Sequence, residues 1–136
     1  MGNSFAWEIP GFAFSLPANI DMSSEGSYLF TPVNVVAASG VGIDTDSACA
    51  PVAASGDAAI GILQNNPQLA EAGSIMVSGI SKALLGGTVS IGQLLMATPV
   101  GGLQVATSGK FAIAQALQAG VTGQYIAVLL VHNGKI

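Results

Sequence analysis

The chain has 136 residues and a mass of 13.5 kDa, a size that predicts a single domain. Charged residues make up 7% of the sequence, against about 25% in an ordinary globular domain. Seven acids outnumber three lysines, and there is no arginine. The net charge of -4 and the lack of a basic run argue against a nucleic-acid partner.

The low charge also predicts how the surface is used. A monomer of this composition would tend to associate, so we expect copies of the chain or a larger partner to cover much of its surface. Mean hydropathy is +0.64, but glycines, Pro99 and polar side chains interrupt the uncharged residues 83–109, so no membrane partner is expected. Neither a secretory signal nor an intrachain disulfide is expected, because no basic segment precedes an apolar run and Cys49 is alone.

Residues 1–26 predict an extended N-terminal arm, because Pro10, Pro17 and several glycines oppose a regular helix or a central strand. The arm carries four aromatic side chains, a residue type that commonly anchors interfaces. They are Phe5, Trp7, Phe12 and Phe14. Two interpretations stay open: the arm docks on a neighbouring molecule through these residues, or it folds back over the core of its own chain.

Residues 27–136 predict a β-barrel domain of short strands separated by Gly, Ser, Asn and Pro turns. The expected strands are 27–36, 58–64, 74–84, 93–97, 103–107, 111–118 and 124–133. Helix-forming residues at 66–73 and 112–120 are too few to be stable alone, so at most one or two short helices are expected. The pattern indicates an all-β fold, a small barrel or sandwich of short antiparallel strands.

The last expected strand is apolar on both faces, which predicts a place in the core or at a subunit interface. The residues assigned to this role are Tyr125, Ile126, Val128, Leu129, Leu130 and Val131.

A sequence pattern occurs twice. "AIGILQ" and "AGSIMV" (59–64 and 72–77) are echoed by "AIAQALQ" and "AGVTGQYIAV" (112–118 and 119–128). Each pair reads as strand, "AG" turn and strand. The repeat predicts two similar hairpins that pack together, each covering the edge of the other.

Few residues could carry chemistry. One Cys and one His, Cys49 and His132, cannot assemble a zinc site. A Cys–His pair is not excluded by their separation, but "SACAP" gives the thiol no basic neighbour, so a small buried cysteine is expected. His132 is expected at a strand end beside a turn.

The carboxylates also give no clear site. Asp44 and Asp46 could offer oxygens to Ca²⁺, but the run of acids and amides typical of a calcium loop is missing, so a solvated loop is expected. "GVGID" (40–44) resembles half of a dinucleotide fingerprint, but no βαβ unit surrounds it. The other acids lie in turn-like sequence near Gly, Pro or Ser. They include Glu8, Glu25, Asp57 and Glu71. We therefore expect no enzyme activity, no metal and no cofactor.

Three motifs follow one another in the middle of the chain: "GILQNNP" (61–67), "AGSIMVSGISK" (72–82) and "GTVSIGQLL" (87–95). They resemble the signature region of the tailed-phage capsid decoration (cement) proteins of the small β-barrel type. The segment "SGKFAIAQALQAGVTGQYIAVLLV" (108–131) is similar to the C-terminal part of that family.

The resemblance covers residues 57–131 and departs from the family pattern at two places. Ala114 stands where glycine is common, and "TPVGG" (98–102) replaces a turn that is often acidic. The N-terminal arm matches no pattern of the family, so its expected role comes from its composition alone.

The resemblance implies a structural virion protein that decorates and stabilises the outer surface of an icosahedral phage capsid. Such a protein would bind the major capsid protein, bridge neighbouring capsomers, often as a homotrimer, and be assembled in the host cytoplasm. The arm aromatics would then be the capsid contacts. An alternative is a glycan- or host-surface-binding β-sandwich module on the virion, for which Phe111 and Tyr125 are the only aromatic residues beyond residue 30. A hydrolase using Asp44 and Asp46 is the third hypothesis.

Overall fold

The computed structural model describes residues 6–24, 27–99 and 102–136, and within them the protein is all-β. The strands are β1 (Ile9–Pro10), β2 (Ala13–Pro17), β3 (Pro32–Ala37), β4 (Ser47–Pro51), β5 (Gly61–Leu63), β6 (Ala72–Met76), β7 (Gly79–Leu84), β8 (Leu94–Ala97), β9 (Leu103–Val105), β10 (Phe111–Ala116) and β11 (Tyr125–Lys135). The predicted fold class is confirmed, as a sandwich-like pair of sheets and without a closed barrel. Neither segment considered for a short helix is helical: residues 66–73 form a turn that leads into β6, and residues 112–120 form most of β10 and a turn.

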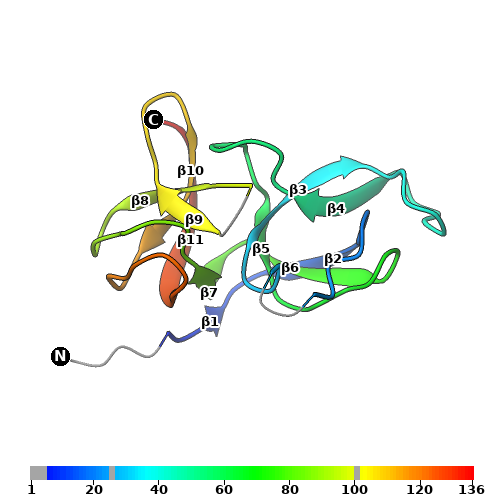
Figure 1. Cartoon of the computed structure of the whole chain (residues 1–136), viewed down its shortest axis with the longest axis horizontal. Helices are drawn as coiled ribbons and strands as arrows, with labels where there is room; N and C mark the ends of the chain where they lie inside the picture. Colours follow the sequence, from blue (N-terminus) through cyan, green and yellow to red (C-terminus); the bar gives the residue numbers. More distant parts are fainter. Residues whose placement is uncertain (1–5, 25–26, 100–101) are drawn as a thin grey trace.

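The strands form two antiparallel sheets that lie side by side along the long axis of the molecule (Figure 1). The five-stranded sheet has the order β2-β6-β5-β3-β4, and the six-stranded sheet has the order β1-β7-β11-β10-β8-β9. Apart from β1, each sheet is built from one continuous stretch of the chain. We call residues 13–76 the N-terminal half and residues 79–136 the C-terminal half.

The two halves have the same topology. Replacing each of β2 to β6 by the strand five places later converts the first strand order into β7-β11-β10-β8-β9. The isolated parallel bridges agree with this equivalence: Ala18, just after β2, pairs with Cys49 of β4, and Leu85, just after β7, pairs with Leu103 of β9. Each sheet therefore curls until these strands approach each other, where a single bridge joins them instead of a ladder.

The hairpins β5–β6 and β10–β11 also correspond in register. Ile62 pairs with Met76 in the first hairpin, and Gln115 pairs with Leu129 in the second. Residues 61–76 therefore align without a gap with residues 114–129, and no aligned position in these ranges holds the same residue. Just before them, Ala59 and Ile60 align with the identical residues Ala112 and Ile113.

The turns inside these two hairpins match as well. Ala70 has a positive φ of 70°, and Gly123, at the equivalent position, has a φ of 88°. In each turn the next side chain accepts a hydrogen bond from the backbone N–H three residues earlier. The distance is 2.7 Å for Glu71 Oε1 and 2.9 Å for Gln124 Oε1.

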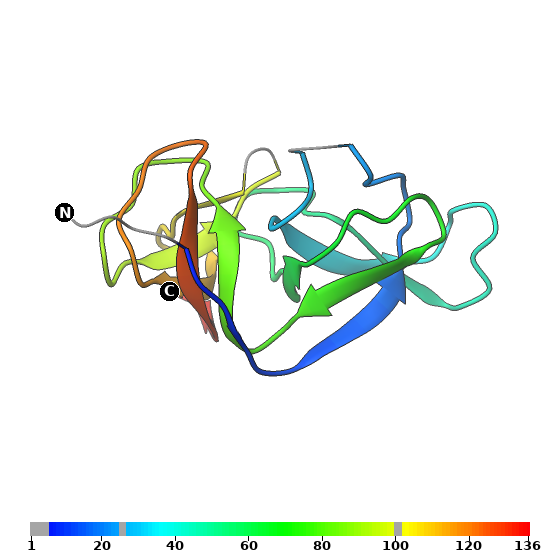
Figure 2. The ribbon, with the colours of Figure 1, turned by 90° about the horizontal axis from the view of Figure 1, so that it is seen from below.

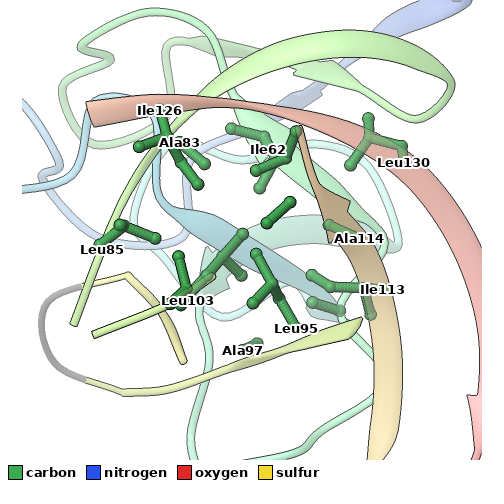
Figure 3. Packing of buried hydrophobic residues seen from close by; sticks show 14 of the residues in the cluster. Ile62, Ala83, Leu85, Leu95, Ala97, Leu103, Ile113, Ala114, Ile126 and Leu130 are labelled. Carbon is green, nitrogen blue, oxygen red and sulfur yellow. The ribbon is translucent and has the colours of Figure 1, made fainter. Parts of the chain in front are cut away.

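The two hairpins expected from the repeated pattern are thus confirmed, but their mutual packing was predicted wrongly. All four strands are interior strands of their sheets, so neither hairpin covers an edge of the other. They meet instead through buried faces, where Ile62 lies in one cluster with Ile113 and Leu130 (Figure 3). The "AG" pairs are also not equivalent, because the pair at 72–73 begins β6 and the pair at 119–120 lies before the turn to β11.

A second cluster lies inside the five-stranded sheet and includes Met22, Val33, Leu63 and Ile75. Ile62 and Leu63 are adjacent, and they belong to different clusters. Because successive side chains of a strand point to opposite faces, β5 is buried on both sides and joins the two halves through their cores.

The predicted N-terminal arm is extended and, from Ile9 to Pro17, paired with its own chain. β1 lies along β7, with Ile9 opposite Ile80, and β2 lies along β6, with Ala13 opposite Met76. Both strands occupy sheet edges. The backbone of this segment therefore folds back on the chain, as one of the two interpretations expected.

The arm also crosses from one sheet to the other at the same place as the β6–β7 connection. There Gly11 N–H donates to the Ser78 carbonyl oxygen at 3.1 Å, and Phe12 N–H donates to Ser78 Oγ at 2.7 Å. Residues 9–17 and 72–80 thus form one bent two-stranded ribbon that passes through both sheets (Figure 2).

Two expected strands differ from the structure, and one strand was not expected. Residues 27–31 form a turn, and the strand expected at 27–36 begins only at Pro32. Residues 74–84 belong to two strands, because the chain changes sheets at 77–78 and Gly79 adopts a φ of 98°. β4 was not expected, since its small residues and Pro51 give no periodic pattern, and it is defined by its pairing with β3.

Candidate interaction surfaces

Three loops meet at the far end of the N-terminal half. Asn19 Oδ1 accepts hydrogen bonds from the N–H groups of Ser39 and Gly40, at 2.8 and 2.9 Å. Leu69 packs on Gly40, where a Cβ atom would lie 2.7 Å from Leu69 Cδ1. The loops around residues 20, 41 and 69 are therefore held together, and we call this surface the acidic tip.

The acidic tip combines apolar and acidic side chains, all of them exposed. Its apolar members are Ile20, Val41 and Leu69, and its acids are Asp21, Asp44, Asp46 and Glu71. Val41 is 85% exposed. A cleft of about 280 Å³ opens beside it, between the end of β2, Asp44 and Ala70. "GVGID" is part of this loop, which joins two antiparallel strands, so no dinucleotide fold surrounds it.

A second surface is the outer face of the six-stranded sheet. The strand register places Ile9, Ile80, Leu129, Gln115 and Leu94 opposite one another across five strands. Paired residues share one face of a sheet, so four apolar side chains and one carboxamide form a row, which we call the apolar row. Ile9 is 61% exposed, and Leu129 is also exposed.

Lys82 lies on the same face as the apolar row, two residues after Ile80 in β7. Its ammonium group is 5.6 Å from the centre of the Phe30 ring. The Phe30 ring also packs edge-on against Tyr125, with 5.9 Å between the ring centres. This face therefore carries a cation beside its apolar side chains.

The C-terminal strand is divided between the core and this outer face. Ile126, Val128 and Leu130 are buried and belong to the large cluster. Tyr125 and Leu129 are exposed, and Val131 is half-buried. From Tyr125 to Leu129, β11 is paired with β7 and also lies beside β10, so a subunit contact at these residues would involve the outer face of the strand.

The arm aromatics within the described residues differ in exposure. Trp7 is 42% exposed and Phe12 is 61% exposed, whereas Phe14 is half-buried in β2. The rings of Phe12 and Phe14 stack, with 6.2 Å between their centres and an interplanar angle of 18°. Phe5 lies outside the described residues. From Ile9 to Pro17 the backbone of the arm is thus paired with its own sheets, while the rings of Phe12 in this segment and of Trp7 before it are exposed.

Cys49 and His132 lie in different halves. Cys49 is buried, as expected, and burial raises the pKa of its thiol. Its Sγ lies 3.6 Å from the Leu16 carbonyl oxygen. His132 is exposed on β11 with a φ of 47°, and its Nε2 lies 2.9 Å from the Val77 carbonyl oxygen. The two side chains belong to separate environments.

The carboxylates have local partners. Ser23 donates to Asp21 from its hydroxyl at 2.6 Å and from its N–H at 3.0 Å, and these bonds lower the pKa of Asp21. Asp57 Oδ2 accepts the Ala54 N–H at 3.0 Å. In the described part of the chain, no three His, Cys, Asp or Glu residues gather as a metal site would require. Glu25 lies outside the described residues.

Composition predicts an aromatic arm and an apolar last strand, but neither the acidic tip nor the apolar row. The tip is assembled from three loops that are distant in sequence, and the row depends on a register across five strands. In the described ranges, no helix is long and apolar enough to cross a bilayer. No protein-family model matches the chain, and no curated protein matches it.

Proposed function

We propose that the protein is a structural component of a virion that decorates and stabilises the outer surface of an icosahedral phage capsid. It would do so by binding the major capsid protein and bridging neighbouring capsomers. The observation that carries this proposal is the arm, whose backbone is paired with both sheets from Ile9 to Pro17. Phe12 within this paired segment and Trp7 just before it are exposed to solvent.

The energetics favour a protein surface as the partner of this arm. Fully burying a large apolar side chain contributes about 1.5–3 kcal/mol. Pairing of β1 and β2 fixes the arm before it docks, which lowers the ordering cost of binding. A shell repeats its sites by symmetry, so modest contacts per copy give high avidity where copies are linked.

The resemblance to the capsid decoration proteins supports the same function through residues that shape the fold. The matching glycines include Gly61 and Gly73, where a Cβ would collide with the Met76 carbonyl oxygen and approach Cys49 Sγ to 2.9 Å. These are packing constraints in β5 and β6. The resemblance therefore lies in residues that shape the fold. This is expected of a structural protein that acts by binding other proteins.

The proposal is tested by binding to phage shells assembled without this protein, measured by co-sedimentation. We expect saturable binding by the intact chain, and a loss of at least about 100-fold in affinity for Trp7→Ala/Phe12→Ala, because central aromatic anchors contribute about 2 kcal/mol or more each. Ile91→Ser is the matched control, since Ile91 is 71% exposed and lies outside the arm.

Circular dichroism and thermal unfolding of each variant verify that the fold is kept. Equal binding by the double variant and the intact chain would show that the arm aromatics are not part of the capsid contact. No binding of the intact chain to any shell at micromolar concentration would contradict the decoration function itself.

A further inference from the structure

The charges of the chain are divided between its two halves. All seven acids lie at or before Glu71, and all three lysines lie at or after Lys82. The division falls at the β6–β7 connection, where the chain passes from the five-stranded to the six-stranded sheet. Glu8 is the exception, because it directly precedes β1 of the six-stranded sheet, and the other six acids belong to the N-terminal half. One half is therefore negative and the other positive.

These opposite charges are not neutralised by direct contact within one molecule. No ion pair joins an acid to a lysine in the part of the chain that the structure describes. Lys82 and Lys135 contact aromatic rings instead, Phe30 at 5.6 Å and Phe111 at 5.5 Å. The loop of residues 38–46 forms one end of the long axis, and β7 and β11 lie in the other half (Figure 1). A single copy therefore leaves both charges available to another molecule.

Both candidate surfaces add apolar contacts to this charge difference. The acidic tip presents Val41 and Leu69 among its carboxylates, and the apolar row presents Ile9 and Leu129 beside Lys82. An interface of protein on protein needs an apolar centre with matched charges around it. Each copy thus carries the two complementary parts of one interface.

We propose that a second copy of this chain docks its acidic tip on the apolar row of the first, so that the protein associates head to tail. The carboxylates of the tip repel nucleic-acid phosphates and anionic lipid. They attract the ammonium group of Lys82 beside the apolar row. An interface between two different patches is heterologous, and it closes into a ring where the rotation between copies permits. This association needs no capsid and goes beyond the proposed function.

Mixing two variants tests the proposal. Val41→Ser/Leu69→Ser removes the apolar centre of the tip, and Ile9→Ser/Leu129→Ser removes that of the row. Light scattering at up to about 200 μM, where weak interfaces are populated, should give the intact chain a multiple of 13.5 kDa. Each variant alone should remain a monomer. Their equimolar mixture should form a complex of two chains and nothing larger, because each partner supplies the one intact surface.

Ile91→Ser, outside both surfaces, should keep the mass of the intact chain, and thermal unfolding verifies that every variant is folded. A monomeric intact chain at the highest concentration would overturn the proposal. Association of the tip variant alone would also overturn it, since it would show that the row binds another row. A tip variant that is monomeric yet binds shells would separate this interface from the capsid contact.

Salt dependence tests the charged part of the interface. Exposed charges are screened beyond about 10 Å at 0.1 M salt and beyond about 3 Å at 1 M. We expect the dissociation constant to rise about 10-fold between 50 and 500 mM NaCl, an effect typical of complementary charged surfaces. Lys82→Gln should reduce this dependence. A dissociation constant independent of salt would contradict the pairing of acidic tip and lysine-bearing face.

Discussion

The two halves of this molecule share a topology and differ in chemistry. In the N-terminal half the hairpin β5–β6 holds Ile62 opposite Met76, and in the C-terminal half Gln115 stands opposite Leu129. The same turn uses Ala70 in one half and Gly123 in the other, both at positive φ. Register and backbone conformation are thus common to both halves, while side chains adapt to local packing. Substitutions at equivalent positions test whether the two halves are also equivalent in stability.

The largest effect is expected one residue before Ile62 and Gln115, where Gly61 and Ala114 are equivalent. A Cβ at Gly61 would collide with the Met76 carbonyl oxygen of the neighbouring strand. Gly61→Ala should lower the free energy of unfolding by about 3 kcal/mol or prevent folding, as overpacking of a rigid site does. Ala114→Gly should cost about 1 kcal/mol, through lost packing and greater chain entropy. Urea unfolding of both variants measures the difference, and equal losses would contradict it.

An intermediate effect, of opposite sign in the two halves, is expected at the shared turn. A residue other than glycine with positive φ is disfavoured by about 1–2 kcal/mol. Ala70→Gly should therefore stabilise the protein by up to about 1 kcal/mol. This is the net value once the conformational entropy that glycine adds to the unfolded chain is subtracted from the relieved strain. Gly123→Ala should destabilise it by about 1 kcal/mol, and it does so through φ alone because nothing lies within 4 Å of the added Cβ.

Thermal unfolding of the two turn variants provides the measurement. Because the backbone conformations match, the two shifts in Tm should have opposite signs. Two shifts of the same sign would show that the turns are not equivalent in energy.

The smallest effect is expected at the side chains that close these turns. Glu71 and Gln124 accept the same backbone hydrogen bond in their respective halves. Glu71→Ala should cost about 0.5–1 kcal/mol, a typical net value for one hydrogen bond. Glu71→Gln should leave the free energy of unfolding nearly unchanged at neutral pH, because Gln124 already fills this role. Urea unfolding at low protein concentration distinguishes the two, and an equal loss for both would assign the effect to charge.

The sequence predicted the all-β class and most of the strands because apolar residues alternate with turn residues from residue 58 onward. It did not predict β2 and β4, since Pro17, Pro51 and small side chains carry no periodic signal and these strands are defined by their partners. The duplication was visible only as a loose echo with shifted "AG" pairs, because residues 61–76 and 114–129 share no residue at any aligned position and the identities just before them are limited to Ala59/Ala112 and Ile60/Ile113.

The candidate surfaces show the same limit. The arm aromatics could be found by composition, because six of eight aromatic residues lie in the first 30. The acidic tip could not, since Asn19 gathers loops that are twenty residues apart through hydrogen bonds to Ser39 and Gly40. The division of charge was present in the sequence. Only the structure shows that it falls where the chain passes from one sheet to the other.

The bent ribbon of residues 9–17 and 72–80 has a mechanical consequence. Two backbone segments, cross-linked at Gly11, Phe12 and Ser78, connect the sheets at this point where one connection would have sufficed. This hydrogen-bonded pair of segments adds to the shared core around Ile62 in resisting rotation of one half against the other. Force applied to one half is therefore expected to be transmitted to the other with little rotation between them.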